Sequence, residues 1–564
     1  RQLFGTRHNH CLTSPVYREK VRKINTLLAQ RYKDHPALGM WHISNEYGGE
    51  CHCPLCQDAF HKWLEKRYGT VEKMNDSFWN TFWSHRYSSF DQVDSPSPIG
   101  ESCNLGLSLA WRRFTSDQFC DFYSWEIEPL KRITPHIPCT ANLMDFFPGI
   151  DYFKLGKLLD RASWDNYPPW AGDERDKAAA LHAACMHDLI RGVGGQKPFM
   201  MMESSPSAVN WHPINRLRQP GVLMLQSLQA IAHGSDTVQY FQFRKGRGSS
   251  EQYHGAIIGH DNSDKTRIFR EVSEVGETLA KVSEVAGSAP ESKVALLYDW
   301  DNFWILNEAQ FGHNDNKKYI ETVKEHYAAW KALGYNVDMI DHSCALSPYR
   351  IVCGPMQYLL HDGYAEKVDA FVKKGGTYVA TYITGWVDEE NLAFLGGYPG
   401  PLRKTLGIWD EETDALDDTQ HNTFTYGGNR YTCKDVCALV HAESARVLSE
   451  YEENFYKGMP ALTKNVHGKG CAYYIAARTD VDFLCHFYGD LAKEAGLEPL
   501  ISHLPDGVLC TERVGDKGRY LFLMNTQPEK RTVSLPPCLN LRTDETMQGE
   551  YTLSGYDVLV LKRR

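Results

Sequence analysis

The sequence predicts an α/β protein in three parts: a barrel-like domain, a doubly wound α/β domain and a small β-sandwich. Strand-like and helix-like segments alternate without a break from residue 3 to residue 285, which is typical of a parallel sheet covered by helices. A second alternating series begins at residue 293 and runs to residue 498, a doubly wound pattern. From residue 505 onward the pattern changes to short strands with a period of two, which predicts the sandwich.

In the first part, each predicted strand ends in polar residues. Ser14 and Pro15 predict the start of the first helix, as N-cap and first helical residue, and a long aromatic-rich helix is predicted over 109–133. An eight-stranded barrel needs two strands more than we count, and we expect them to precede Arg1. Functional side chains are expected at the carboxyl ends of the strands. The six predicted strands are 3–5, 37–43, 138–144, 162–164, 198–202 and 237–243.

The second part follows a linker, Gly287-Ser288-Ala289-Pro290. Its first strand, 293–298, is not followed by a glycine-rich phosphate-binding turn, so we interpret this part as a scaffold or assembly domain. We place the three domains at residues 1–287, 288–500 and 501–564.

The composition excludes several classes of function. The net charge is -10 with acids and bases mixed along the chain, which argues against nucleic acid or a membrane surface as a partner. No run of 18 apolar residues is present, so no membrane-spanning helix is predicted. The 16 cysteines are dispersed except for one group, which favours a reducing, cytoplasmic compartment with mostly free thiols. Because the chain begins with Arg1 rather than methionine, a signal peptide is not judged from this end.

Two glutamates end apolar strands of the first domain. Glu46 follows the strand 37–43 and is preceded by Asn45, and Glu203 follows 198–202. Paired carboxylates flanking a scissile bond are the minimum requirement for glycoside hydrolysis, and an adjacent amide can bond a sugar hydroxyl. For a single glutamate, a surface salt bridge is the better interpretation; for two at strand ends, we favour catalysis.

Three cysteines lie within six residues directly after Glu46. Cys51, Cys53 and Cys56 supply three thiolates, and Cys11 follows another predicted strand end on the same rim. Four thiolates form a closed tetrahedral site, which indicates a structural metal. The alternatives are four free thiols, or a histidine as fourth ligand: His52, His10 or His61.

These motifs together resemble the glycoside hydrolase family 42 β-galactosidases over nearly the whole chain. The resemblance rests on Ile43-Ser44-Asn45-Glu46-Tyr47-Gly48, Met202-Glu203-Ser204 and Cys51-x-Cys53-x2-Cys56. It implies a TIM (β/α)8 barrel with its acid/base on strand four and its nucleophile on strand seven. It also implies a flavodoxin-like trimerisation domain, which Phe371-Val372-Lys373-Lys374-Gly375-Gly376 resembles, a small C-terminal β-sandwich and a homotrimer.

Carried over residue by residue, the resemblance assigns roles to eleven side chains. Glu46 matches the general acid/base and Glu203 the nucleophile. Cys11 completes a structural zinc site with the three clustered cysteines. The expected substrate contacts are Arg7, Asn45, Trp211, Glu251 and His254.

The function predicted is retaining hydrolysis of terminal β-D-galactose from galactosides by double displacement. Another retaining barrel glycosidase, acting on β-glucosides or α-L-arabinopyranosides, is the alternative, because such enzymes share the two glutamates. A non-catalytic carbohydrate-binding protein would lack one of them, and both are present. Family members carry about a quarter of the barrel before the position of Leu3, so we expect this chain to be a fragment.

Overall fold

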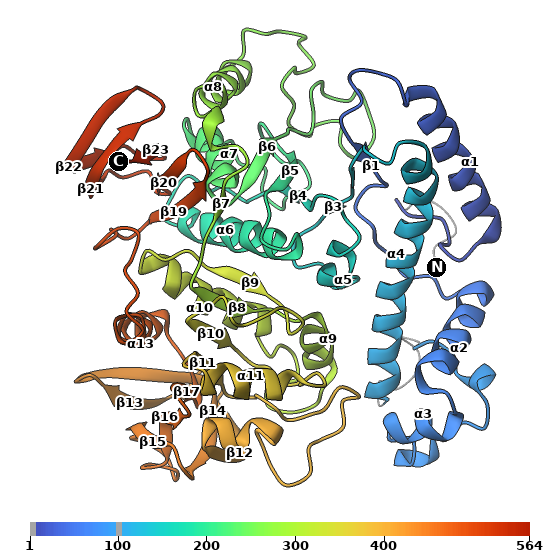
Figure 1. Ribbon diagram of the computed structural model, residues 1–564, viewed down its shortest axis with the longest axis vertical. Helices are drawn as coiled ribbons and strands as arrows, with labels where there is room; N and C mark the ends of the chain where they lie inside the picture. The colour runs from blue at the N-terminus through green and yellow to red at the C-terminus, as the bar shows by residue number, and fades with distance from the viewer. Residues whose placement is uncertain (1–6, 97–103) are drawn as a thin grey trace.

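Six short parallel strands organise the first half of the chain in the computed structural model, which describes residues 7–96 and 104–564. They form two sheets, β1-β2 and β3-β4-β5-β6, in which every pairing is parallel. Ala141 alone separates β2 from β3; the other successive strands are connected by helices, which cover the outside of the sheets (Figure 1). The strand predicted at residues 3–5 lies outside the described residues. The strands are β1 (Trp41–His42), β2 (Cys139–Thr140), β3 (Asn142–Leu143), β4 (Ser163–Asn166), β5 (Phe199–Ser204) and β6 (Ser235–Val238).

The first helix of this half begins where the sequence predicts, and the helix predicted over 109–133 ends at Ile133 but begins earlier, at Leu105. Ser14 caps α1 by accepting the amide of Tyr17, and Pro15 occupies the first turn, because proline has no amide hydrogen to lose there. The long helix α4 packs along α1 on the outside of the strands (Figure 1). The helices are α1 (Pro15–Tyr32), α2 (Pro54–Tyr68), α3 (Val71–Ser77), α4 (Leu105–Ile133), α5 (Tyr152–Gly156), α6 (Asp176–Val193), α7 (Val222–Ala232) and α8 (Arg267–Lys281).

Two of the predicted strands are shorter than expected. The prediction over 37–43 contains only Trp41–His42 as strand, and the strand predicted over 237–243 ends at Val238. After Val238 the backbone bonds to the following loop. The carbonyl of Gln242 accepts a hydrogen bond from the amide of Ile257 at 3.0 Å, and the carbonyl of Phe243 accepts one from the amide of Ile258 at 2.8 Å. These loop bonds replace the sheet ladder, so 239–243 was wrongly assigned to the strand.

The second domain is built on a seven-stranded sheet of order β15-β16-β17-β11-β10-β8-β9. Its parallel centre confirms the predicted doubly wound α/β pattern, whereas β15 and β16 are antiparallel. A second, four-stranded sheet of β12, β13, β14 and β18, which the sequence did not reveal, is also inserted here. The principal elements are β8 (Val294–Leu297), α9 (Trp300–Glu308), α10 (Tyr319–Ala332), β9 (Asp338–Ile340), β10 (Ile351–Gly354), α11 (Tyr364–Lys373), β11 (Thr377–Thr381), β12 (Ile408–Ala415), β13 (Asn422–Tyr426), β14 (Asn429–Ala442), β15 (Arg446–Glu450), β16 (Pro460–His467), β17 (Gly470–Ile475), β18 (Ala477–Thr479) and α13 (Val481–Glu494).

The C-terminal β domain is a six-stranded antiparallel sheet of order β22-β21-β23-β20-β19-β7. Its edge strand β7 (Ala289–Pro290) belongs to the predicted linker, so the linker pairs with the end of the chain. Arg513 on β19 is fully buried and donates to the carbonyls of Ile231, Ser235 and Ser288, which fastens this domain to the first. The remaining strands are β19 (Val508–Gly515), β20 (Gly518–Asn525), β21 (Arg531–Asn540), β22 (Glu545–Leu553) and β23 (Val558–Arg563).

Across residues 7–96 and 104–564, no helix combines the length and the apolar character needed to cross a membrane.

Candidate active site

Glu46 and Glu203 meet at the carboxyl ends of two strands. Glu46 lies in the loop after β1, and Glu203 is the next-to-last residue of β5. Asp165, from the end of the intervening strand β4, joins them: each residue has a carboxylate oxygen within 4.8 Å of the others. Retaining glycosidases hold their two carboxyl groups about 5–5.5 Å apart, and inverting ones about 6.5–9.5 Å. The closeness of the two glutamates therefore fits direct attack by one carboxylate.

The backbone that carries Glu46 is a left-handed turn. Ser44 has a φ of 53° and Glu46 a φ of 46°, values uncommon for residues other than glycine. The amide of Glu46 donates to Asn142 Oδ1 at 3.1 Å, and His42 Nε2 bonds the same oxygen at 2.9 Å. Asn142 is buried and is the first residue of strand β3, so a neighbouring strand fixes the position of the Glu46 backbone.

Arg7 contacts Glu46, and Asn45 contacts Glu203. Arg7 forms an ion pair with Glu46, whose side chain is 12% exposed, while the arginine itself is 60% exposed. When the Asn45 amide is oriented to satisfy both of its atoms, its nitrogen donates to Glu203 Oε1 at 3.3 Å and its oxygen accepts from Arg7. A single amide therefore spans the space between the two carboxylates.

Glu203 accepts a hydrogen bond from Tyr167, the residue that directly follows strand β4. Tyr167 Oη donates to Glu203 Oε2 at 2.7 Å. Burial raises the pKa of Glu203; the Tyr167 bond opposes this rise, and the charge of Glu46 adds to it. Burial and the charge of Glu203 raise the pKa of Tyr167 far above its usual value, so the phenol stays protonated and acts only as a donor toward Glu203.

Asp165 is the third carboxyl of the cluster. Burial, followed by the charges of Glu203 and Glu46, raises the pKa of Asp165 well above its usual value. Asn142 Nδ2 donates to Asp165 Oδ2 at 2.6 Å, and the other carboxyl oxygen has no partner among the described residues. A neutral Asp165 adds no third negative charge to the site.

The three remaining predicted substrate contacts differ in exposure. Trp211 is 54% exposed with its ring 5.4 Å from that of Tyr167, an edge contact that leaves the tryptophan accessible. His254 is 1% exposed, and its buried Nε2 has no hydrogen-bond partner in the described chain. Burial lowers the pKa of His254 to about 4, so its imidazole is neutral near pH 7. Glu251 lies on the exposed loop, close enough for its charge to raise the pKa of Glu203.

The four predicted cysteines converge in one buried cluster that can bind a metal ion. Their sulfur atoms all lie within 4.8 Å of one another. Cys11 Sγ lies 3.5 Å from Cys53 Sγ and 3.4 Å from Cys56 Sγ, and the last two sulfurs are 3.8 Å apart. A tetrahedral zinc with bonds of about 2.3 Å separates its sulfurs by about 3.8 Å. These separations fit such an ion, and all four residues, Cys51 included, are free thiols.

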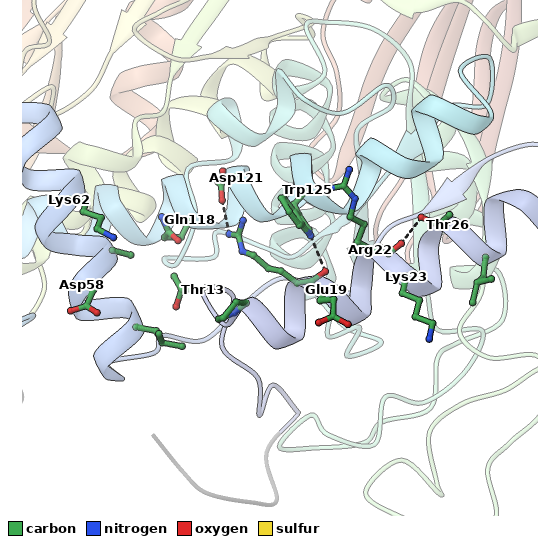
Figure 2. A pocket seen from close by; sticks show the side chains of 15 residues that line it. Thr13, Glu19, Arg22, Lys23, Thr26, Asp58, Lys62, Gln118, Asp121 and Trp125 are labelled. Atoms are coloured by element: carbon green, nitrogen blue, oxygen red, sulfur yellow. Dashed lines mark hydrogen bonds and ion pairs between the residues drawn. The ribbon is translucent and has the colours of Figure 1, made fainter.

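A groove of about 880 Å³ lies elsewhere, on the outer face of α1, α2 and α4. Figure 2 shows Asp58 and Lys62 of α2, with Asp121 and Trp125 of α4, around it. Neither catalytic candidate is among its lining residues. The guanidinium of Arg22 covers the Trp125 ring at 5.0 Å, which leaves this ring face closed to a sugar.

Three polar residues of the site, Asp165, Tyr167 and Asn142, had no role assigned from the sequence. Tyr167 belongs to the strand-end segment Asp165-Asn166-Tyr167, which the sequence marks as polar without indicating a partner. Asn142 is hidden within an apolar strand, 138–144. Adjacent placement of β4 and β5 brings Tyr167 to Glu203, and only the three-dimensional sheet reveals it.

Known proteins share this architecture over the full length of the chain. The family profile described as Beta-galactosidase matches residues 1–282, its trimerisation domain residues 292–498 and its C-terminal domain residues 507–563. The chain is 47% identical to the β-galactosidase Pbg of Clostridium perfringens, covering 100% of this chain and 84% of that protein. It is 44% identical to GanA of Bacillus subtilis, with 100% and 85% covered.

Solved structures agree with this assignment. Gan42B, a β-galactosidase from G. stearothermophilus, superimposes with a TM-score of 0.98 at 45% identity, covering 100% of this chain and 84% of that one. The β-galactosidase of Halorubrum lacusprofundi does so with a TM-score of 0.92 at 27% identity, covering 100% and 84%. Two parallel sheets, each with a glutamate near the carboxyl end of one strand, together with helices on the outside, define a barrel-type glycoside hydrolase. The chain belongs to glycoside hydrolase family 42, the β-galactosidase family.

Proposed function

We propose that this protein removes terminal β-D-galactose from galactosides with retention of configuration. The observation that carries the proposal is the cluster in which carboxylate oxygens of Glu46 and Glu203 lie within 4.8 Å. We assign Glu203 as nucleophile because Tyr167 and Asn45 aim donors at its two oxygens. We assign Glu46 as acid/base because it lies on the opposite side of this gap, on the loop after β1.

In the first step, a Glu203 oxygen attacks the anomeric carbon while the glycosidic bond breaks. Glu46 gives its proton to the departing oxygen, so the leaving group departs neutral. In the second step, a water attacks the same carbon, Glu46 accepts the proton of that water, and the Glu203 carboxylate departs. The Tyr167 phenol stabilises the Glu203 carboxylate in the free enzyme and again as it is released.

The residues around the glutamates support a role in holding the sugar. Arg7 pairs with Glu46 and the Asn45 amide bonds Glu203. The Asn45 amide suits the sugar 2-hydroxyl, whose hydrogen bonds strengthen in the transition state. The unpartnered Nε2 of His254 offers a buried contact for a hydroxyl, and Trp211 offers an apolar ring face. Together with Glu251, we propose that these side chains select galactose.

We further propose that the four-cysteine cluster binds structural zinc. The sulfur separations and four thiolate ligands suit zinc, and a closed site has no position for substrate. When bound, the ion ties the loop of Cys11 to the loop that follows Glu46. A homotrimer is supported by the match to a trimerisation domain over 292–498, and the domain limits 1–287, 288–500 and 501–564 enclose the three matched regions. The free cysteines of the described chain support a reducing, cytoplasmic compartment.

The test is hydrolysis of aryl glycosides by the purified chain. We expect the β-galactoside to be cleaved in preference to the β-glucoside and the α-L-arabinopyranoside, with the β-anomer of galactose released first. Glu203→Ala should lose almost all turnover, and Glu274→Ala, on the exposed surface of α8, should retain it. A preference for the glucoside would reassign the sugar-selecting residues, and substantial turnover by Glu203→Ala would refute the nucleophile.

A further inference from the structure

Glu126 is a buried carboxylate that the reaction described above does not use. It lies on the long helix α4 and is 6% exposed. Its carboxylate accepts the Ser44 hydroxyl at 3.1 Å on Oε1 and at 3.0 Å on Oε2, and Tyr47 Oη donates to Oε2. No arginine, lysine or histidine forms an ion pair with Glu126 within the described part of the chain. A buried carboxylate held only by hydroxyl groups is costly to maintain, which calls for a reason beyond packing.

The two donors to Glu126 immediately flank the catalytic turn. Ser44 precedes Asn45 and Tyr47 follows Glu46, so the Glu126 carboxylate is bonded to residues on both sides of the turn. Burial and the Glu126 charge raise the pKa of Tyr47 well above its usual value, which keeps this phenol a donor. On the other side of the turn, Asn142 holds the Glu46 amide at 3.1 Å. The left-handed backbone at Ser44 and Glu46 is therefore held at both ends.

We propose that Glu126 is a positioning residue for the general acid: through Ser44 and Tyr47 it maintains the left-handed turn that aims the Glu46 carboxyl at the leaving-group oxygen. Glu126 itself touches neither catalytic glutamate in any described hydrogen bond. The inference rests on the proposed function, because it assumes that Glu46 donates the proton. It predicts a defect in proton donation rather than in sugar binding or nucleophilic attack.

Leaving groups of different acidity separate proton donation from the other steps. The dinitrophenolate of a 2,4-dinitrophenyl β-galactoside leaves without being protonated, whereas the phenolate of a phenyl β-galactoside needs a proton from the general acid. A glutamine at position 126 keeps the shape but turns one of the two acceptor oxygens into a donor. A general acid contributes about 100- to 10,000-fold. We therefore expect Glu126→Gln to reduce kcat/KM for the phenyl galactoside by about 10-fold or more, and for the dinitrophenyl galactoside by less than about 3-fold.

The experiment compares kcat/KM of both substrates for the wild-type protein, Glu126→Gln and a matched control. Glu128→Gln lies on the same helix but on its exposed side, where Glu128 pairs with Arg22 at 2.9 Å, and should leave both rates unchanged. If Glu126→Gln fails to fold, the double variant Ser44→Ala/Tyr47→Phe removes the same hydrogen bonds from the donor side and should show the same selective loss.

The outcomes separate the inference from the function on which it rests. A selective loss on the phenyl substrate supports the positioning role. An equal loss on both substrates, or no loss on either, overturns it, because a merely structural residue would not discriminate by leaving group. Failure of the wild-type protein to cleave either galactoside would instead refute the proposed activity.

Discussion

Replacing Tyr167 with phenylalanine tests the environment of Glu203, the proposed nucleophile. The substitution removes a single hydroxyl, which donates to Glu203 Oε2 at 2.7 Å, and retains the ring beside Trp211. A hydrogen bond to a charged group is worth about 1.5–3 kcal/mol, and about 1.4 kcal/mol corresponds to tenfold in rate. If the whole free energy of this hydrogen bond contributes to the transition state, kcat/KM should fall by about 10- to 150-fold when the bond is removed.

The same substitution should change the pH dependence with a defined sign. The Tyr167 bond lowers the pKa of Glu203 against the rise caused by burial. Without the bond the pKa of Glu203 rises further, and the proposed role as nucleophile requires an ionised Glu203. The acidic limb of the kcat/KM profile should therefore move to higher pH.

The assay is kcat/KM for an aryl β-galactoside across the acidic range, for wild type, Tyr167→Phe and the control Tyr32→Phe. Tyr32 is 40% exposed at the end of α1, away from the carboxylates, and its substitution should alter neither rate nor limb. A Tyr167→Phe protein with wild-type rates, or with an acidic limb at unchanged or lower pH, would refute this account of the Glu203 environment.

Two further predictions concern stability. Arg513→Ala removes a buried guanidinium that donates to three carbonyl groups and pairs with Asp236. It should lower the free energy of unfolding by about 3–5 kcal/mol; chemical denaturation that shows a loss no larger than for the exposed Arg446→Ala would contradict this. A strong chelator should remove about one zinc per chain and lower the unfolding midpoint and the activity together, without changing the preference among aryl glycosides. Metal analysis of the purified protein that finds no zinc would exclude the site.

The sequence could indicate the two glutamates because each follows an apolar strand. Parallel strands align their carboxyl ends, so a polar residue at such an end is a candidate regardless of the details of the fold. The cysteines were equally accessible, since three thiols in six residues are local information. Glu126 was not, because a glutamate within a helix is ordinarily solvent-exposed, and its burial depends on the loop after β1 packing against α4.

The elements that escaped prediction also depend on distant pairing. The antiparallel β14 pairs with β12, β13 and β18, and its partners are brought together from different parts of the domain. The strand predicted over 237–243 ended early because the loop through Ile257 competes for its backbone groups. The local pattern of apolar residues indicates which residues are buried, but it does not indicate which distant segment will form hydrogen bonds with their backbone amides.

Glu46, the proposed acid, lies on a loop rather than on a strand, and side chains from helix α4 and strand β3 of the first domain contact residues 44–50 of this loop. A strand would hold Glu46 through its own ladder, whereas a left-handed loop must be held by side chains. Helix α4 supplies such side chains at both ends of the loop. Glu126 accepts hydrogen bonds from the hydroxyl groups of Ser44 and Tyr47, and Trp111 Nε1 donates to Glu50 Oε2 at 3.1 Å. The cysteine cluster begins one residue after Glu50, so it extends the restraint beyond the helix. The position of Glu46, the proposed acid, therefore depends on helix α4, which lies outside the barrel strands, and substitution of Glu126 on this helix should change proton donation without touching the sugar.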